Sequence, residues 1–393
     1  MRTYMLSALF VVIALLGYMS YEQGFFKSET LPYDEEQEGL KDQITIRFSH
    51  VVAEDTPKGQ AVLKFAELVQ KRSHHRIQVE ISPNGMLYND VNELQALKDN
   101  DVQMIAPTLS KVTKEVPSWE VLDLPYLFSS TAEVQKVFTS DVGERLLNEL
   151  QHENMKALGF WQNGFKQMIN EKEIIQDVQD FKGLRVRAME SDMLKQQFEQ
   201  VKATPVTSSF DELFTELNKQ KMDALENTIS NIYSKSLYKK ENHLTISNHG
   251  ILAYAVIINK QFWQQLEPAD QQLIEQALKD ATEWNMENAM QMNDHDLQQL
   301  KNLSVEIHTL TPQQQTAWKK AFMPLYRSFE NRSDAHYLHE IQQLIQKKQI
   351  PKLYYNNRKM TIKRFHTRLD IFVQSFKMLL NQCFHPFSAK RTL

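Results

Sequence analysis

Two arginines, Arg185 and Arg187, alternate with apolar residues in the segment GLRVRAMES at residues 183–191. In a β-strand the apolar residues would share one face and the two arginines the other. A guanidinium group near a strand end can hold a carboxylate by two parallel, charge-assisted hydrogen bonds. The pattern therefore predicts either a carboxylate-binding arginine, with Arg187 as the candidate, or two ordinary surface arginines.

Other kinds of chemistry find little support in the sequence. The 393 residues contain one cysteine, Cys383, so neither a disulfide nor a thiolate metal site is expected. The ten glycines form no phosphate-binding loop, and no Gly-x-Ser-x-Gly segment marks a nucleophile elbow. The net charge of −4 argues against a nucleic-acid-binding protein. We therefore predict no enzyme, catalytic residue, metal ligand, cofactor or nucleic-acid partner.

The elements that would position such an arginine follow an alternating order. Residues 44–48 and 76–81 alternate as strands, and residues 102–106 are a short apolar run. Thr56 followed by Pro57 is typical of a helix start, and residues 90–98 predict a second helix. This β-α-β-α-β order predicts a mostly parallel sheet with helices on both faces.

The same order returns after about residue 155. Strands are expected at 156–160, 184–188, 222–226 and 251–258, the last one central, and a helix at 189–201. The segment SFDE at 209–212 predicts a capping box that opens another helix. Pro268 opens a helical stretch that extends to about Leu300 without glycine or proline. At this length two α/β domains are expected, with a ligand cleft between them.

Both ends of the chain differ from this body. Residues 1–21 contain an apolar run that suits either a cleaved signal peptide or an uncleaved membrane anchor, and residues 22–42 read as a polar linker. Residues 347–393 predict a basic amphipathic extension, because residues 351–393 hold nine Lys or Arg and one acid, Asp370. The extension would either contact an anionic membrane or pack on the body.

Seven segments in the same order resemble one known family, the extracytoplasmic solute-binding subunit of TRAP transporters, in its C4-dicarboxylate-binding (DctP-type) branch. They are FSHVVAEDTPKG (48–59), MIAPTLSK (104–111), LDLPYLF (122–128), FWQNGFK (160–166), GLRVRAMES (183–191), LENTISNIY (225–233) and LTISNH (244–249). The resemblance covers residues 44 to about 345. It implies a two-domain periplasmic-binding-protein-like α/β fold with a central cleft and a long helix spanning both domains.

The resemblance also implies ligand contacts. Arg187 would clamp a substrate carboxylate and Asn227 would donate a hydrogen bond to it, although Leu225 and Thr228 stand where the family usually has Gln and Pro. The remaining implied contacts are a second cation, an aromatic wall and three first-domain residues that could reach a second carboxylate: Lys166, Phe210, His50, Lys58 and Ser110.

The family pattern further implies a domain division. Domain I would comprise residues 43–163 with 253–292, and domain II residues 164–252 with 293–346.

The expected protein is a periplasmic monomer that captures succinate, malate, fumarate or a similar organic acid and delivers it to the small and large membrane subunits of a TRAP transporter. It would be free, or tethered to the inner membrane by its N-terminal segment. Two alternatives stay open: a ligand-binding accessory of a membrane sensor, and the same family with another carboxylate, such as a sugar acid, a keto acid or an aromatic acid.

Overall fold

The computed structural model describes residues 43–150 and 154–346. The predicted N-terminal segment, most of the linker and the basic C-terminal extension lie outside these residues. Two compact units divide the chain after Arg332. The described part of the second unit holds one helix, α13 (His336–Gln346).

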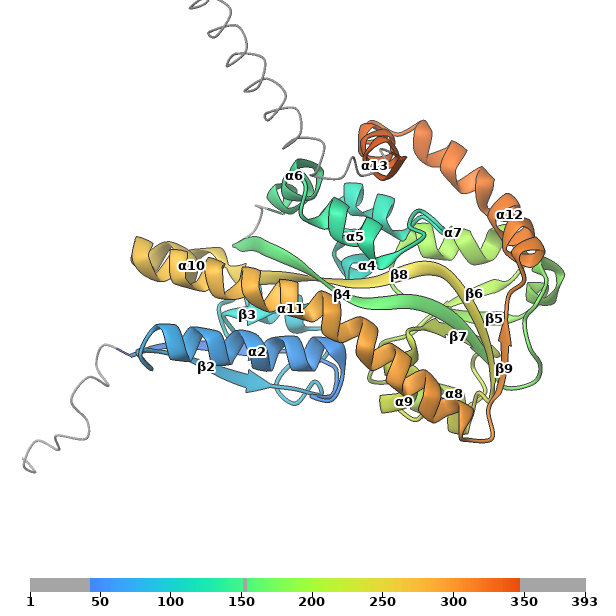
Figure 1. The fold of residues 1–393 in the computed structure, drawn as a ribbon, viewed down its shortest axis with the longest axis horizontal. Helices are drawn as coiled ribbons and strands as arrows, with labels where there is room; N and C mark the ends of the chain where they lie inside the picture. The colour runs from blue at the N-terminus through green and yellow to red at the C-terminus, as the bar shows by residue number, and fades with distance from the viewer. Residues whose placement is uncertain (1–42, 151–153, 347–393) are drawn as a thin grey trace, which may run out of the picture. The chain divides into compact units, whose positions relative to one another are not determined.

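The first unit begins with the predicted alternation of strands and helices (Figure 1). Helix α2 begins at Pro57, and the hydroxyl of Thr56 accepts a hydrogen bond from the Gly59 backbone N–H at 3.2 Å, as the Thr-Pro pair predicts. Strands β2, β1 and β3 pair in parallel with β1 in the middle. The elements are β1 (Ile44–Ser49), α2 (Pro57–Arg72), β2 (Ile77–Ser82), α3 (Glu93–Lys98) and β3 (Met104–Ile105).

The rest of the first unit adds a second set of parallel strands and a long helix. The elements in order are α4 (Leu109–Val112), η3 (Pro117–Asp123), α5 (Thr131–Phe138), α6 (Asp141–Glu149), β4 (Met155–Asn170), η4 (Val178–Phe181), β5 (Arg185–Ala188), α7 (Asp192–Gln200), β6 (Thr204–Thr207), α8 (Leu213–Asn218), β7 (Ala224–Asn227), α9 (Ile229–Ser234), η5 (Leu237–Lys239), β8 (His243–Asn259), α10 (Lys260–Gln265), α11 (Pro268–Lys301), β9 (Glu306–Thr309) and α12 (Pro312–Glu330). The predicted capping box at 209–212 is wrong: the Ser209 hydroxyl accepts from the Glu212 N–H at 3.2 Å, but Glu212 Oε2 accepts from that hydroxyl and not from the Ser209 backbone. Helix α8 begins only at Leu213, after Glu212, without a side-chain cap.

The strands form one mixed sheet in the order β2-β1-β3-β8-β4-β7-β5-β6, with β9 beside β8. The expectation of a mostly parallel sheet holds for the two flanking groups and is wrong for the centre, where the long strands β4 and β8 pair antiparallel. β8 also runs antiparallel to β3, and β4 to β7. An apolar run shows that a strand is buried but does not encode the direction of its neighbour.

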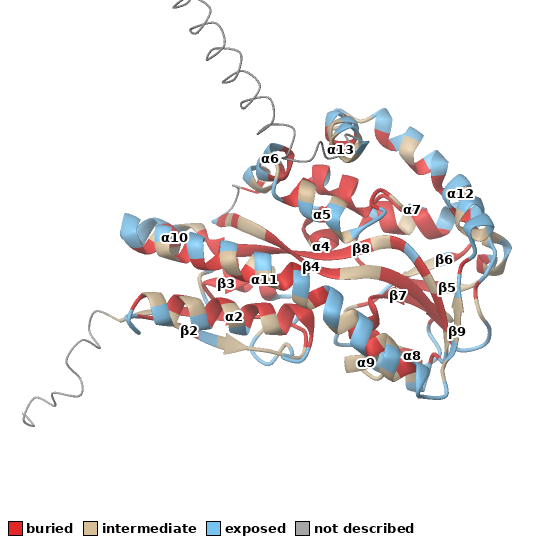
Figure 2. Cartoon of the chain, in the orientation of Figure 1, coloured by how far each residue is buried: buried red, intermediate tan, exposed pale blue. Residues whose placement is uncertain are grey.

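The core lies along these central strands. Figure 2 shows β4 and β8 buried over most of their length. The predicted long helix, α11, packs on α2, β4 and α9. Its buried residues Ile274, Ala277, Leu278 and Ala281 follow the three- and four-residue spacing of one helical face. Helix α2 follows β1 of one parallel group, and α9 follows β7 of the other. Helix α11 therefore contacts elements of both groups of parallel strands.

One buried acid near this sheet makes stability depend on pH. Glu241 is 2% exposed, and its Oε2 atom has no hydrogen-bond partner within the described residues. Burial, with Glu171 and Asp223 nearby, raises the pKa of Glu241 to about 8. The unfolded chain binds this proton only below pH ~4.3, so the associated stability is complete below that pH and is lost as the pH rises to about 8.

Glu241→Gln is therefore expected to raise the free energy of unfolding at pH 8 by about 1–3 kcal/mol. Urea unfolding at pH 8 and pH 4 measures the effect, and little gain is expected at pH 4. Glu173→Gln, at an exposed position nearby, is the control and should change stability little at either pH. An equal gain at both pH values for Glu241→Gln would show that the charge is not the cause.

Candidate functional site

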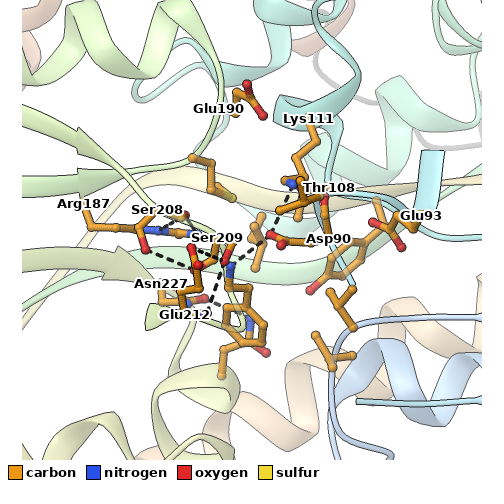
Figure 3. A pocket seen from close by; sticks show the side chains of 18 of the residues that line it. Asp90, Glu93, Thr108, Lys111, Arg187, Glu190, Ser208, Ser209, Glu212 and Asn227 are labelled. Carbon is orange, nitrogen blue, oxygen red and sulfur yellow. Dashed lines mark hydrogen bonds and ion pairs between the residues drawn. The ribbon is translucent and has the colours of Figure 1, made fainter. Parts of the chain in front are cut away.

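A cavity of about 200 Å³ lies where strands of both parallel groups end (Figure 3). Residues just beyond the carboxyl ends of β1 and β3 line one side, and residues at the ends of β5, β6 and β7 line the other. Parallel strands direct their carboxyl ends to one edge, which is where α/β proteins bind ligands. These lining residues include Val51, Val52, Thr108, Lys111, Arg187, Met189, Ser208, Phe210 and Asn227.

Arg187 lies in this wall on strand β5. The residue is 3% exposed, and its Nε and Nη2 atoms donate to the backbone oxygen of Ser208 at 3.2 and 3.0 Å. These two bonds fix the guanidinium plane, while Nη1 makes no hydrogen bond to the described residues and stays available to a ligand. Burial lowers the pKa of Arg187, and Asp90 and Glu226 oppose the shift. The group therefore stays charged at neutral pH.

Asn227 ends strand β7 beside Arg187 (Figure 3). Its Oδ1 atom accepts from the Thr228 N–H and from Asn231 Nδ2, both at 2.9 Å. The backbone N–H that Thr228 supplies would be missing if proline stood there. With Oδ1 engaged, the Asn227 amide nitrogen is a donor without a partner in the part of the chain that is described.

The segment after β6 joins the two sides of the cavity. Phe210 lines the wall, and its backbone N–H donates to Asp90 Oδ2 at 2.9 Å. Lys111 Nζ lies 3.2 Å from the same Asp90 oxygen. The backbone N–H of Asp90 in turn lies 3.4 Å from an oxygen of Asp211. These bonds hold the loop before α3 against the loop before α8, which encloses the cavity.

Lys58 supplies a buried cation on the side opposite Arg187. The side chain is 0% exposed, lines the cavity and donates from Nζ to the Ala106 backbone oxygen at 2.9 Å. Its ammonium lies 4.1 Å from the centre of the Tyr254 ring, a cation–π contact. Burial lowers the pKa of Lys58 to about 8, while Glu93 and Asp90 oppose the shift. Lys58 and Arg187 therefore supply cations at two separate places in the wall, in addition to Lys111, which pairs with Asp90.

Three residues predicted as ligand contacts do not line this cavity. Lys166 Nζ is bound to Glu226 Oε1 at 2.7 Å, with both side chains almost fully buried. The hydroxyl of Ser110 donates to Asp123 Oδ1 at 2.8 Å. His50 is fully buried, and burial lowers its pKa to about 3, so it is neutral. The geometry brings Arg187, Asn227, Phe210 and Lys58 together and leaves Lys166, Ser110 and His50 outside the wall.

The Lys166 ion pair belongs to a larger buried network. Glu226 Oε2 lies 2.8 Å from His249 Nε2, and His249 Nδ1 lies 2.8 Å from Ser247 Oγ. This order of carboxylate, imidazole and hydroxyl resembles a hydrolase triad. Ser247 is 0% exposed, however, and does not line the cavity. The network therefore compensates buried charge and offers a substrate no accessible nucleophile.

The polar wall residues that sequence reasoning missed include Asp90, Glu93, Lys111 and Tyr254. For Glu93 the sequence contains a signal. It shares the buried face of α3 with Ala96 and Leu97, at the i, i+3, i+4 spacing that places side chains together on a helix. A carboxyl group on an apolar helix face requires a special partner or a function.

Across residues 43–150 and 154–346, no helix combines the length and hydrophobicity of a membrane span. Within those ranges no three His, Cys, Asp or Glu side chains gather in a metal-binding arrangement.

Known proteins with similar sequences include several that are named as carboxylate-binding proteins. Residues 48–332 match the family model described as bacterial extracellular solute-binding protein, family 7. A C4-dicarboxylate-binding protein of Bacillus subtilis, DctB, is 43% identical over 304 residues, which are 77% of this chain and 87% of that protein. The C4-dicarboxylate-binding periplasmic protein DctP of Shewanella loihica is 40% identical and covers 73% of this chain and 85% of its own.

Solved structures show the same fold. A TRAP periplasmic solute-binding protein of Shewanella oneidensis with bound succinate has a TM-score of 0.74 and 36% identity, over 77% of this chain and 100% of its own. A protein of the same description from Pseudomonas aeruginosa, with bound L-malate, has a TM-score of 0.71 and 30% identity, over 72% and 99%. The expected two-domain solute-binding fold is thereby confirmed.

Proposed function

Because the chain belongs to family 7 of the bacterial extracellular solute-binding proteins, we propose that it captures a C4-dicarboxylate and delivers it to the membrane subunits of a TRAP transporter. Arg187 is the observation that carries this proposal. It is a buried, charged guanidinium, fixed on the Ser208 carbonyl, with Nη1 available to a ligand in the cavity. A buried cation without an anionic partner is unfavourable, and a carboxylate supplies that partner.

The arrangement of donors favours a ligand with two acidic ends. Arg187 and the Asn227 amide would hold one carboxylate, and Lys58 the other. Phe210 would bound the ligand between them. Relatives described with bound succinate and L-malate support a four-carbon diacid. Lys166, Ser110 and His50 would then act from behind the wall, where Lys166 pairs with Glu226, the neighbour of Asn227 in the chain.

We further propose the division into domain I (43–163 with 253–292) and domain II (164–252 with 293–346). The chain passes between the two proposed domains three times, at residues 163–164, 252–253 and 292–293. Contacts among these three points support the division. Gly164 is paired with Leu252 at a register shift in the β4–β8 ladder. Asn293 of α11 donates from Nδ2 to the Asn163 backbone oxygen at 2.7 Å and accepts from the Ser230 N–H at 3.0 Å. Closure about this point would enclose the ligand.

The proposed location is the periplasm, which the names of the related proteins from Shewanella loihica and Rhodobacter capsulatus support. There the protein would act as a monomer that meets the small and large membrane subunits. Residues 1–21 would direct export.

A thermal-shift panel of organic acids tests the ligand class. Succinate, malate and fumarate are expected to raise the melting temperature, because a ligand at 100 times its Kd stabilises the folded state by about 2.7 kcal/mol. Butyrate, with four carbons and one carboxylate, is the matched control and should shift it little. A sugar acid, keto acid or aromatic acid that stabilises the protein while all three C4-dicarboxylates fail would contradict the proposed ligand.

A further inference from the structure

Glu93 is a buried carboxyl group in the cavity wall, without a hydrogen-bond partner among residues 43–150 and 154–346. It is the first residue of α3, is 1% exposed and lines the cavity wall (Figure 3). Neither Oε1 nor Oε2 accepts a hydrogen bond from the described residues, and no cation of those residues lies within ion-pair distance. A buried carboxylate in such surroundings is costly, so protonation or a hydrogen-bond donor in the cavity would stabilise it.

The groups around Glu93 come from every side of the cavity. Lys58 on α2 and Lys111 on α4 favour its charged form, while Asp90 and Asp211 in the facing loops disfavour it. Tyr254 on β8 also interacts with it electrostatically. Burial is the largest effect, and together these influences raise the pKa of Glu93 to about 7. With these neighbours Glu93 is therefore balanced between its charged and neutral forms near neutral pH.

A dicarboxylate would change that balance. Its second carboxylate would lie against Lys58, whose ammonium has only the Ala106 carbonyl and the Tyr254 ring as close partners among the described residues. A negative charge at that place repels a neighbouring carboxylate and neutralises the cation that had favoured it. Two carboxyl groups in one enclosed site share a proton rather than both ionise.

We propose that Glu93 takes up a proton from solvent when the dicarboxylate binds and, as a neutral carboxyl group, donates a hydrogen bond to a ligand oxygen. This inference rests on the proposed function and adds to it, because it makes capture a proton-linked event. Glu93 then contributes the donor that the second carboxylate requires, and its charge no longer opposes the anion.

The linkage has a definite sign. Between the pKa that the protein neighbours give Glu93, about 7, and its higher pKa in the complex, binding consumes a proton. Affinity should therefore rise as the pH falls through this window, by up to about tenfold per pH unit, and level off below it.

Calorimetry with succinate at pH 7.5, in two buffers of different ionisation enthalpy, counts the protons taken up. Wild-type protein should take up as much as about three quarters of a proton per succinate through Glu93, because a group with a pKa of about 7 is already about one quarter protonated at pH 7.5. Calorimetry alone does not show whether Glu93 or the nearby Lys58 takes up the proton, because the pKa of Lys58 is about 8. Infrared difference spectra with ¹³C-carboxyl succinate distinguish a protein carboxyl group from the ligand and from the lysine. The carbonyl band of a protonated, unlabelled carboxyl group should grow on binding to wild-type protein and be missing in Glu93→Gln.

The variants separate the two forms of Glu93. Glu93→Gln carries a permanent N–H donor and should keep succinate affinity at pH 7.5 within about threefold, which is less than one hydrogen bond is worth. Glu190→Gln is the matched control, since Glu190 also lines the cavity but is partly exposed and paired with Lys114. It should leave the infrared band and the proton uptake unchanged.

Three results would overturn the inference. The first is succinate binding by wild-type protein without proton uptake, which requires no variant to fold. The second is the same protonated-carboxyl band in Glu93→Gln. The third is a loss of affinity above tenfold in a folded Glu93→Gln protein, which would mean that the anion is the binding form. If wild-type protein binds no C4-dicarboxylate at all, the proposed function fails, and the inference fails with it.

Discussion

Replacing Arg187 with alanine is expected to weaken dicarboxylate binding by a factor on the order of 30 to 4,000, since removing one partner of a buried charge pair costs about 2–5 kcal/mol. The guanidinium is fixed by the Ser208 carbonyl before the ligand arrives, so little ordering entropy opposes the contact. Titration calorimetry with succinate or malate measures the change.

Arg185 supplies the matched control, because it lies two residues away on the same strand. Its Nε and Nη2 atoms bind Asp223 at 2.9 and 2.8 Å, and it does not line the cavity. Arg185→Ala should bind the ligand nearly as tightly as the wild-type protein. Equal losses in the two variants would point to a general effect on folding, and unchanged affinity in Arg187→Ala would remove the anchor role.

Replacing Lys166 with methionine is expected to destabilise the folded protein by about 3–5 kcal/mol, because it leaves a buried carboxylate without its main counter-charge. Both side chains of the Lys166–Glu226 pair are about 1% exposed or less. Lys166 and His249 hold the pKa of Glu226 at about 2 against the effect of burial. Urea unfolding at neutral pH measures the loss.

Lys172→Met is the comparison for this prediction. Lys172 lies 3.8 Å from Asp223, and its side chain is 70% exposed, so its pair should contribute less than about 1 kcal/mol. A similar, small effect of both lysine variants would show that burial does not strengthen the Lys166 pair. A Lys166→Met protein of normal stability that no longer binds succinate would instead support the direct ligand contact implied by the family pattern.

Local signals in the sequence predicted many elements correctly. The Thr56-Pro57 pair marked the start of α2, and Pro268 marked the start of α11. Such signals act within one helical turn, so they can be read without knowing the rest of the fold. The apolar run at 251–258 likewise identified part of β8.

Local sequence patterns could not predict which distant segments pair with each other. The antiparallel β4–β8 ladder joins residues such as Phe160 and Ala255, and nothing in either strand specifies the other's direction. The Lys166–Glu226 pair is another case, because the residues are 60 positions apart. A charged side chain looks the same in sequence whether it meets a ligand or an internal partner.

The candidate site was recovered in part. Family resemblance pointed to Arg187, Asn227, Phe210 and Lys58, and all four line the cavity. The acids and Lys111 were missed because a charged residue before or within a short helix usually faces solvent. Only the burial of Glu93 on the apolar face of α3 sets it apart. The residues proposed to hold the second carboxylate could therefore be identified fully only from the three-dimensional structure.

A crystal structure of the protein with succinate tests the central claim most directly. The proposed function predicts succinate inside the cavity, with one carboxylate within hydrogen-bond distance of Arg187 Nη1 and the Asn227 amide nitrogen, and the other beside Lys58. A ligand bound elsewhere, or one in the cavity that leaves Arg187 without a carboxylate contact, would contradict it.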